Sequence, residues 1–164
     1  MKNKTKSIVF GAIVCAMYTA LTMVSASFGL ANGFIQVRIS EALTILPFFT
    51  PHAIWGLFAG CVISNLLTAC PLWDIVFGSL ATLIGAYFTY LAGKCKHKNA
   101  HLLAPVGPIV SNTAIIPLIL TFVYGIKQAY PLMCVSIFLG EFISAGILGT
   151  LLLLALKKHR NSIF

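Results

Sequence analysis

Long apolar runs, separated by short polar or basic segments, dominate this chain. A helix needs about 20 mostly apolar residues to cross the hydrocarbon core of a bilayer. The runs therefore predict an all-α membrane protein, a compact bundle of six transmembrane helices in a single integral membrane domain over residues 1–164. The expected spans cover residues 8–30, 34–50, 53–69, 75–93, 102–124 and 131–156.

The boundary between the second and third spans is the weakest. It depends on Thr50, Pro51 and His52. Proline lacks a backbone donor and disfavours helical geometry in the residue before it, so this segment predicts a break. A single long helix over residues 41–69 is the alternative.

Composition limits the function classes. Of 164 residues, 59% are apolar and only 9% are charged, whereas soluble domains carry about 25% charged residues. This excludes a water-soluble enzyme, a disordered chain and a secreted disulfide scaffold. The five cysteines form no CxxC pair and the four histidines form no HxxxH pair, so we expect no metal site.

The basic residues orient the chain. The net charge is +8, and nine of the eleven Lys and Arg residues fall into three clusters beside the apolar runs. Such clusters mark the cytoplasmic side of a membrane protein, so we expect both termini in the cytoplasm and no nucleic-acid partner. The clusters are Lys2, Lys4 and Lys6; Lys94, Lys96 and Lys98; and Lys157, Lys158 and Arg160.

Polar residues within the spans are the candidate binding residues, because ionisable groups inside a membrane are costly and usually functional. In the six-span topology they all lie between the midplane and the outer surface, which predicts a pocket open to the outside. Carboxylates, amides and a guanidinium suit a heterocycle with adjacent N–H and C=O groups, and Phe34, Trp73 and Tyr130 could stack on it. The candidates are Gln36, Arg38, Glu41, Asn65, Trp73, Asp74, Asn112 and Glu141, with Glu141 first.

Structural roles are open for several of these residues. Arg38 and Glu41, three residues apart, could pair with each other. Trp73 could anchor the chain at the membrane interface. Asn65 and Asn112 could form hydrogen bonds between helices.

Small residues at four-residue spacing form three stripes, which allow close approach of another helix. We expect two of them to pack inside the bundle, whereas the first could face either the bundle or an external partner. The first is Ala12, Ala16 and Ala20; the others are Gly56, Gly60 and Ser64, and Ser136, Gly140 and Ser144.

Two segments resemble the queuosine-precursor transporter (QueT) family. They are Ile-Gln-Val-Arg-Ile-Ser-Glu-Ala-Leu-Thr-Ile-Leu-Pro at residues 35–47 and Leu-Trp-Asp-Ile-Val-Phe-Gly-Ser-Leu-Ala-Thr at residues 72–82. The resemblance implies a substrate-binding S component of an energy-coupling factor (ECF) transporter in the bacterial plasma membrane. Such a subunit is not an enzyme and has no cofactor of its own.

The resemblance also implies partners and a ligand. The partners are a transmembrane coupling protein and two ABC-type ATPases, which use ATP, and Ala12 and Ala16 match the docking motif, with Ala20 extending it. The ligand is a 7-deazaguanine: queuine or its nitrile or aminomethyl precursor base. The alternatives are an S component for another vitamin or nucleobase, and a standalone gradient-driven carrier. An intramembrane enzyme built on Glu41, His52 or Glu141 is disfavoured because no HExxH or GxSxG motif occurs.

Overall fold

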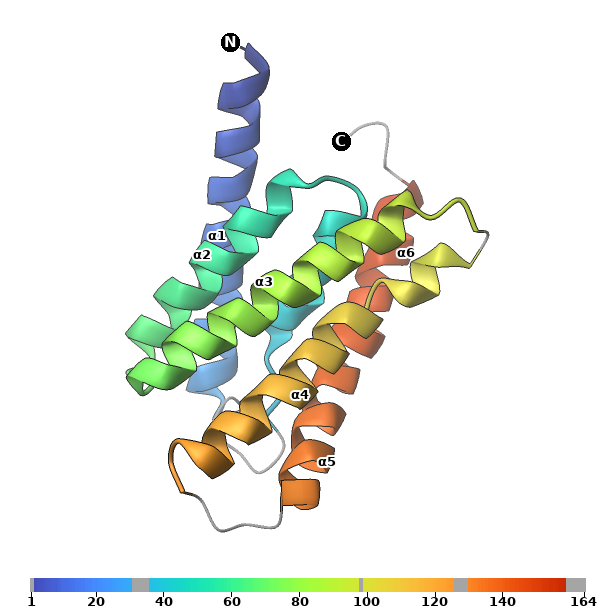
Figure 1. Ribbon diagram of the computed structural model, residues 1–164. Helices are drawn as coiled ribbons and strands as arrows, with labels where there is room; N and C mark the ends of the chain where they lie inside the picture. The colour runs from blue at the N-terminus through green and yellow to red at the C-terminus, as the bar shows by residue number, and fades with distance from the viewer. Residues whose placement is uncertain (1, 31–35, 98, 126–129, 159–164) are drawn as a thin grey trace.

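The computed structural model describes residues 2–30, 36–97, 99–125 and 130–158, which fold into helices joined by short connections (Figure 1). The elements are α1 (Lys2–Ser27), the 3₁₀ helix η1 (Ile39–Phe48), α2 (His52–Leu67), α3 (Leu72–Lys94), the 3₁₀ helix η2 (Ala100–Leu103), α4 (Val106–Phe122), α5 (Tyr130–Glu141), the π-helix η3 (Phe142–Gly149) and α6 (Thr150–Lys158).

Four helical stretches are long and apolar enough to cross a membrane: 4–27, 72–94, 100–122 and 130–158. They correspond to the first, fourth, fifth and sixth expected spans. The last one combines α5, η3 and α6 in one continuous run. The described residues thus form helices joined by short connections, and the four long apolar stretches are consistent with a membrane protein.

The expected α-helix over residues 34–50 is corrected. Residues 34 and 35 lie outside the described residues, and within residues 36–50 only Ile39–Phe48 is a long helical segment, the ten-residue 3₁₀ helix η1. At about 2 Å per residue η1 spans roughly 20 Å, short of the roughly 30 Å hydrocarbon core. The 16 residues of α2 reach roughly 24 Å. Because η1 ends at Phe48 and α2 begins at His52, the alternative of one helix over residues 41–69 is wrong.

The centre of the bundle is the buried segment η1. All residues from Ser40 to Pro47 are buried, and η1 contacts α1, α3, η3 and α6. Its neighbours can approach closely because they offer glycines: a Cβ atom on Gly93 of α3 would overlap the backbone carbonyl of Phe48. The segment that carries Glu41 is therefore enclosed by helices.

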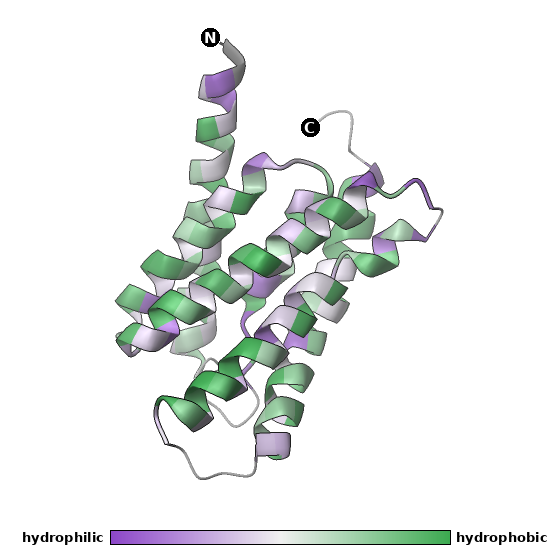
Figure 2. Cartoon of the chain, in the orientation of Figure 1, coloured by the Kyte–Doolittle hydropathy of each residue, from purple (hydrophilic) through white to green (hydrophobic). Residues whose placement is uncertain are grey.

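The interior is more polar than the surface. Large apolar side chains such as Ile8, Phe28 and Phe122 are exposed, whereas Thr22, Ser64 and many other hydroxyl-bearing residues are buried. Figure 2 shows hydrophobic residues along the outward faces of the helices and hydrophilic residues at the tip of α1 and after α3. This distribution fits a lipid-facing surface around polar contacts between helices.

Two of the small-residue stripes pack inside the bundle, as expected. A Cβ atom on Gly56 would overlap the carbonyl oxygen of Gly11, and one on Gly60 would lie 2.9 Å from the Cβ of Tyr18. Ser64 is buried beside them. The second of these two stripes consists of Ser136, Gly140 and Ser144, and all three residues are buried.

The basic clusters within the described residues gather at one end of the molecule. The N-terminal end of α1, the C-terminal end of α3 and the C-terminal end of α6 all lie there (Figure 1). Asp74 lies in the first turn of α3 and Lys94 ends the helix, so these two charged residues are about 30 Å apart along its axis.

We predict that Gly56→Leu destabilises the protein, because the new side chain has no space between α1 and α2. Overpacking of this kind costs about 1–3 kcal/mol or more. Thermal unfolding of the detergent-purified protein would show a lower midpoint. Ala12→Leu, on the exposed face of α1, should leave the midpoint unchanged. Equal midpoints for both variants would contradict this packing.

Candidate binding site

Seven of the eight candidate residues line two adjoining chambers within the bundle. Both chambers are lined by Gln36, Arg38, Gly78 and Ile116. The smaller, of about 50 Å³, also contains Glu41, Asn112 and Glu141. The larger, of about 250 Å³, also contains Asn65 and Asp74. Residues from five separate segments of the chain therefore meet at one place.

The eighth candidate, Trp73, lies outside both chambers. Its side chain is 48% exposed, and its ring packs on Phe77 with the centroids 5.9 Å apart. Tyr130 is exposed at the start of α5, and Phe34 lies outside the described residues. The lining of the chambers is thus mainly polar and aliphatic rather than aromatic.

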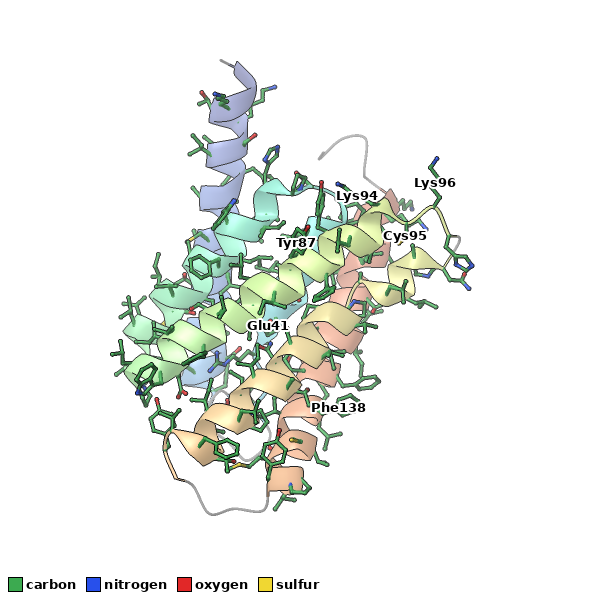
Figure 3. All side chains as sticks on the ribbon, in the orientation of Figure 1. Glu41, Tyr87, Lys94, Cys95, Lys96 and Phe138 are labelled. Atoms are coloured by element: carbon green, nitrogen blue, oxygen red, sulfur yellow. The ribbon has the colours of Figure 1, made fainter. Side chains whose placement is uncertain are left out.

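Helix α1 holds the segment that enters the site. Three polar residues on one face of α1, spaced four and three apart, contact three successive residues of the segment. Ser25 Oγ accepts a hydrogen bond from the Ile39 amide at 2.9 Å, Thr22 Oγ1 donates to Ser40 Oγ at 2.8 Å, and the Tyr18 hydroxyl donates to Glu41 Oε1. Tyr18 is fully buried and Glu41 is 2% exposed, so this ladder fixes the carboxylate at the centre of the bundle (Figure 3).

Arg38 and Asn65 form a second contact between segments. Arg38 Nη1 donates to Asn65 Oδ1 at 3.3 Å, and Asn65 is 2% exposed. Arg38 is thus bonded to α2, while Glu41 is bonded to Tyr18. The asparagine orients the guanidinium at the wall that the two chambers share.

Glu141 is held by Asn112. The Nδ2 of Asn112 on α4 donates to Glu141 Oε1 at 2.9 Å. Glu141 is the last residue of α5, and the π-helix η3 begins directly after it. Such widened turns are frequent at functional sites. Gly140 packs so closely on the chain that a Cβ atom there would overlap the carbonyl oxygen of Gln36.

Each of the three acids has one carboxylate oxygen that is buried without a hydrogen-bond partner among the described residues. These are Glu41 Oε2, Asp74 Oδ1 and Glu141 Oε2. A buried carboxylate oxygen without a partner is costly. The three therefore form acceptor positions suited to a ligand that carries several N–H donors.

The sequence analysis missed Tyr18 and Thr82. Thr82 lines the smaller chamber, and Tyr18 supports Glu41 from behind. The sequence does carry a signal for Tyr18, because Tyr18, Thr22 and Ser25 share one face of the mainly apolar part of α1.

The alanine stripe lies on the opposite face of α1. Ala12, Ala16 and Ala20 are all exposed, whereas Val14 and Tyr18 between them are buried. Internal packing therefore does not account for this stripe. One helix carries the support of the site on one face and an open small-residue surface on the other.

Comparison with known sequences assigns the chain. The family model described as QueT transporter matches residues 8–158. The chain belongs to the QueT transporter family. A relative from Lactococcus lactis subsp. cremoris (strain MG1363), named Queuosine precursor transporter QueT, is 42% identical over 84 residues, which is 51% of this chain and 48% of the relative. The matched region thus covers about half the length of that QueT relative. No solved structure matches the chain.

We predict that Gly140→Ala weakens ligand binding, because the methyl group would push the backbone at Gln36 away from Glu141. Gly146→Ala is the matched control in the same helical run. There the Cβ atom would lie 3.3 Å from the Phe142 ring, which can move slightly. Affinity measured by calorimetry should fall only in the first variant. An unchanged affinity in Gly140→Ala would contradict the placement of Gln36.

Proposed function

We propose that this chain is the substrate-binding S component of an ECF-type ABC importer and binds a 7-deazaguanine precursor of queuosine. Membership of the QueT transporter family supports a role in transport. The name of the Lactococcus relative supports a queuosine precursor as cargo. The ligand would be queuine or its nitrile or aminomethyl precursor base.

The observation that carries the proposal is the set of three carboxylate oxygens without partners around the chambers. A 7-deazaguanine has N–H donors at N1, at the exocyclic amine and at the pyrrole nitrogen. Burying such a base would satisfy acceptors that are otherwise costly to bury. Glu141 or Asp74 would accept from N1–H and the amine. Arg38, Asn65 or Asn112 would donate to the carbonyl.

The volume of the two chambers also fits a ligand of this size. Drug-sized ligands occupy clefts of about 300–1,000 Å³. The larger chamber, of about 250 Å³, together with the small one beside it, suits a single bicyclic base. Gln36 and Arg38 line both chambers, so the segment that α1 holds would contact the ligand directly.

Transport would need a partner with an ATPase. In this proposal Ala12, Ala16 and Ala20 dock on the transmembrane coupling protein, which carries two ABC-type ATPases, and ATP is used there. Exposure of all three alanines supports the docking role, because small residues allow helices to approach closely in lipid.

The proposal places the basic end in the cytoplasm and the acidic chambers toward the outside. The chain would take up the base from outside and topple in the membrane after docking. The N-terminal end of α1 and the C-terminal ends of α3 and α6 lie at one end of the bundle, which supports this orientation (Figure 1).

A gradient-driven carrier is the second candidate, because Glu141 lies in a candidate membrane span and could carry a proton on its buried Oε2, which has no hydrogen-bond partner among the described residues. Uptake that persists in cells lacking the ATPase module would favour that candidate. Loss of uptake in those cells would favour the S component.

We predict that the purified chain binds 7-deazaguanines and not riboflavin or biotin. Glu141→Gln should weaken binding by about 10- to 100-fold, because a hydrogen bond to a charged group contributes about 1.5–3 kcal/mol. Trp73→Leu, outside the chambers, is the matched control and should bind normally. Calorimetry measures both. Absence of binding for every deazaguanine would overturn the substrate assignment.

We predict that Ala16→Leu abolishes co-purification with the coupling module and leaves the affinity for the base intact. The larger side chain would separate α1 from the partner helix. Val24→Leu, also exposed on α1, is the control and should co-purify normally. A stable complex with Ala16→Leu would show that the partner docks elsewhere.

A further inference from the structure

A second concave surface lies between α3 and α4, away from the acidic chambers. It is a groove of about 560 Å³ with a lining that is almost entirely apolar. Its lining includes the small residues Ala92, Gly107 and Ala114. Its walls include Phe88 and Val110, which are 56% and 59% exposed.

Close packing of the two helices creates this shape. A Cβ atom on Gly85 would lie 2.7 Å from the Cα of Pro108, and one on Gly107 would lie 2.7 Å from the carbonyl oxygen of Gly85. The backbones therefore meet at this point. The larger side chains on either side project beyond the line where the two backbones meet, and the groove runs between them. We call the apolar part of this groove the furrow.

The length of the groove matches one leaflet of a bilayer. Along α3 and its C-cap the lining runs from Ile84 to Cys95, and the eleven helical rises between these two residues span roughly 16 Å. Half of the hydrocarbon core is roughly 15 Å. Because the candidate span ends at Lys94, the Cys95 end lies at the membrane interface and the Ile84 end near the midplane.

Basic side chains stand at the interfacial end. Cys95 lines the groove at this end, and its exposed sequence neighbours Lys94 and Lys96 lie next to it, outside the lining, at the end of α3 (Figure 3). The Lys94 ammonium lies 4.4 Å from the centre of the Tyr90 ring, which positions it on the helix by a cation–π contact. A positive end joined to an apolar furrow complements a molecule with an anionic head and a long hydrocarbon tail.

We propose that this groove is a binding site for an anionic phospholipid. One acyl chain lies in the furrow between α3 and α4, and the phosphate is bound by Lys94 and Lys96. Basic pockets between membrane helices recognise anionic headgroups in this way. The site is separate from the acidic chambers, so it does not depend on the identity of the transported base.

Native mass spectrometry of the full chain in detergent, titrated with phosphatidylglycerol or phosphatidylcholine, tests the proposal. We expect preferential binding of phosphatidylglycerol. Lys94→Ala with Lys96→Ala should weaken it by roughly 30-fold, about fivefold for each lysine. Lys157→Ala with Lys158→Ala, at the same end of the molecule, is the matched control and should have little effect.

A second pair of variants tests the furrow. Ala114→Phe should fill it and reduce lipid binding, whereas Val135→Phe on the exposed face of α5 should not. Equal binding of the two lipids, equal loss in both lysine pairs, or full binding by Ala114→Phe would overturn the proposal. So would photocrosslinking of position 114 to the coupling protein in place of lipid. Unchanged thermal midpoints without lipid would show that each variant is folded.

Discussion

The arrangement of this bundle depends on the cost of placing Glu41 and Glu141 inside a protein whose outer surface is apolar. Water is the usual partner of a carboxylate, and inside a membrane protein other polar groups must replace it. Tyr18 and Asn112 each supply one donor. The second oxygen of each acid has no partner within the described parts of the chain. The fold thus stabilises these two acids incompletely, and in our proposal the remaining acceptors bind the ligand.

Much of the surrounding structure serves to hold these groups in place. The 3₁₀ helix η1 is too short to span the membrane, yet it is buried on all sides because it carries Glu41 to the centre. Tyr18, Thr22 and Ser25 of α1 bind its first residues, and Gly140 allows Gln36 to pack beside Glu141. The opposite face of α1 is open at the alanine stripe. If the coupling protein docks on this face, as we propose, a shift of α1 would act directly on the segment that lines the chambers.

The sequence predicted the all-helical membrane fold, because long apolar runs report lipid-facing surface directly. It also predicted the helix break at Thr50–Pro51 and the internal packing of Gly56 and Gly60. It failed for residues 34–50, where hydrophobicity alone cannot separate a lipid-facing helix from a segment buried by other helices. The π-helix after Glu141 has no sequence signal either, since α and π turns differ only in their hydrogen-bond spacing.

For the site, the small number of polar residues within the apolar runs was informative. Seven of the candidates selected for this reason line the chambers. Trp73 was misleading because aromatic residues also occur on lipid-facing surfaces. Tyr18 was missed because a tyrosine in an apolar run resembles a core residue until its hydroxyl partner is known.

The central claim is that the three partly satisfied acids bind the base. The most direct test is an experimental structure of the chain with a 7-deazaguanine bound. Our account predicts the base within the two chambers, with its N–H groups within hydrogen-bond distance, about 2.7–3.2 Å, of oxygens of Glu41, Asp74 or Glu141. A base bound elsewhere, or one whose N–H donors meet only backbone carbonyls while the three carboxylates remain without partners, would contradict it.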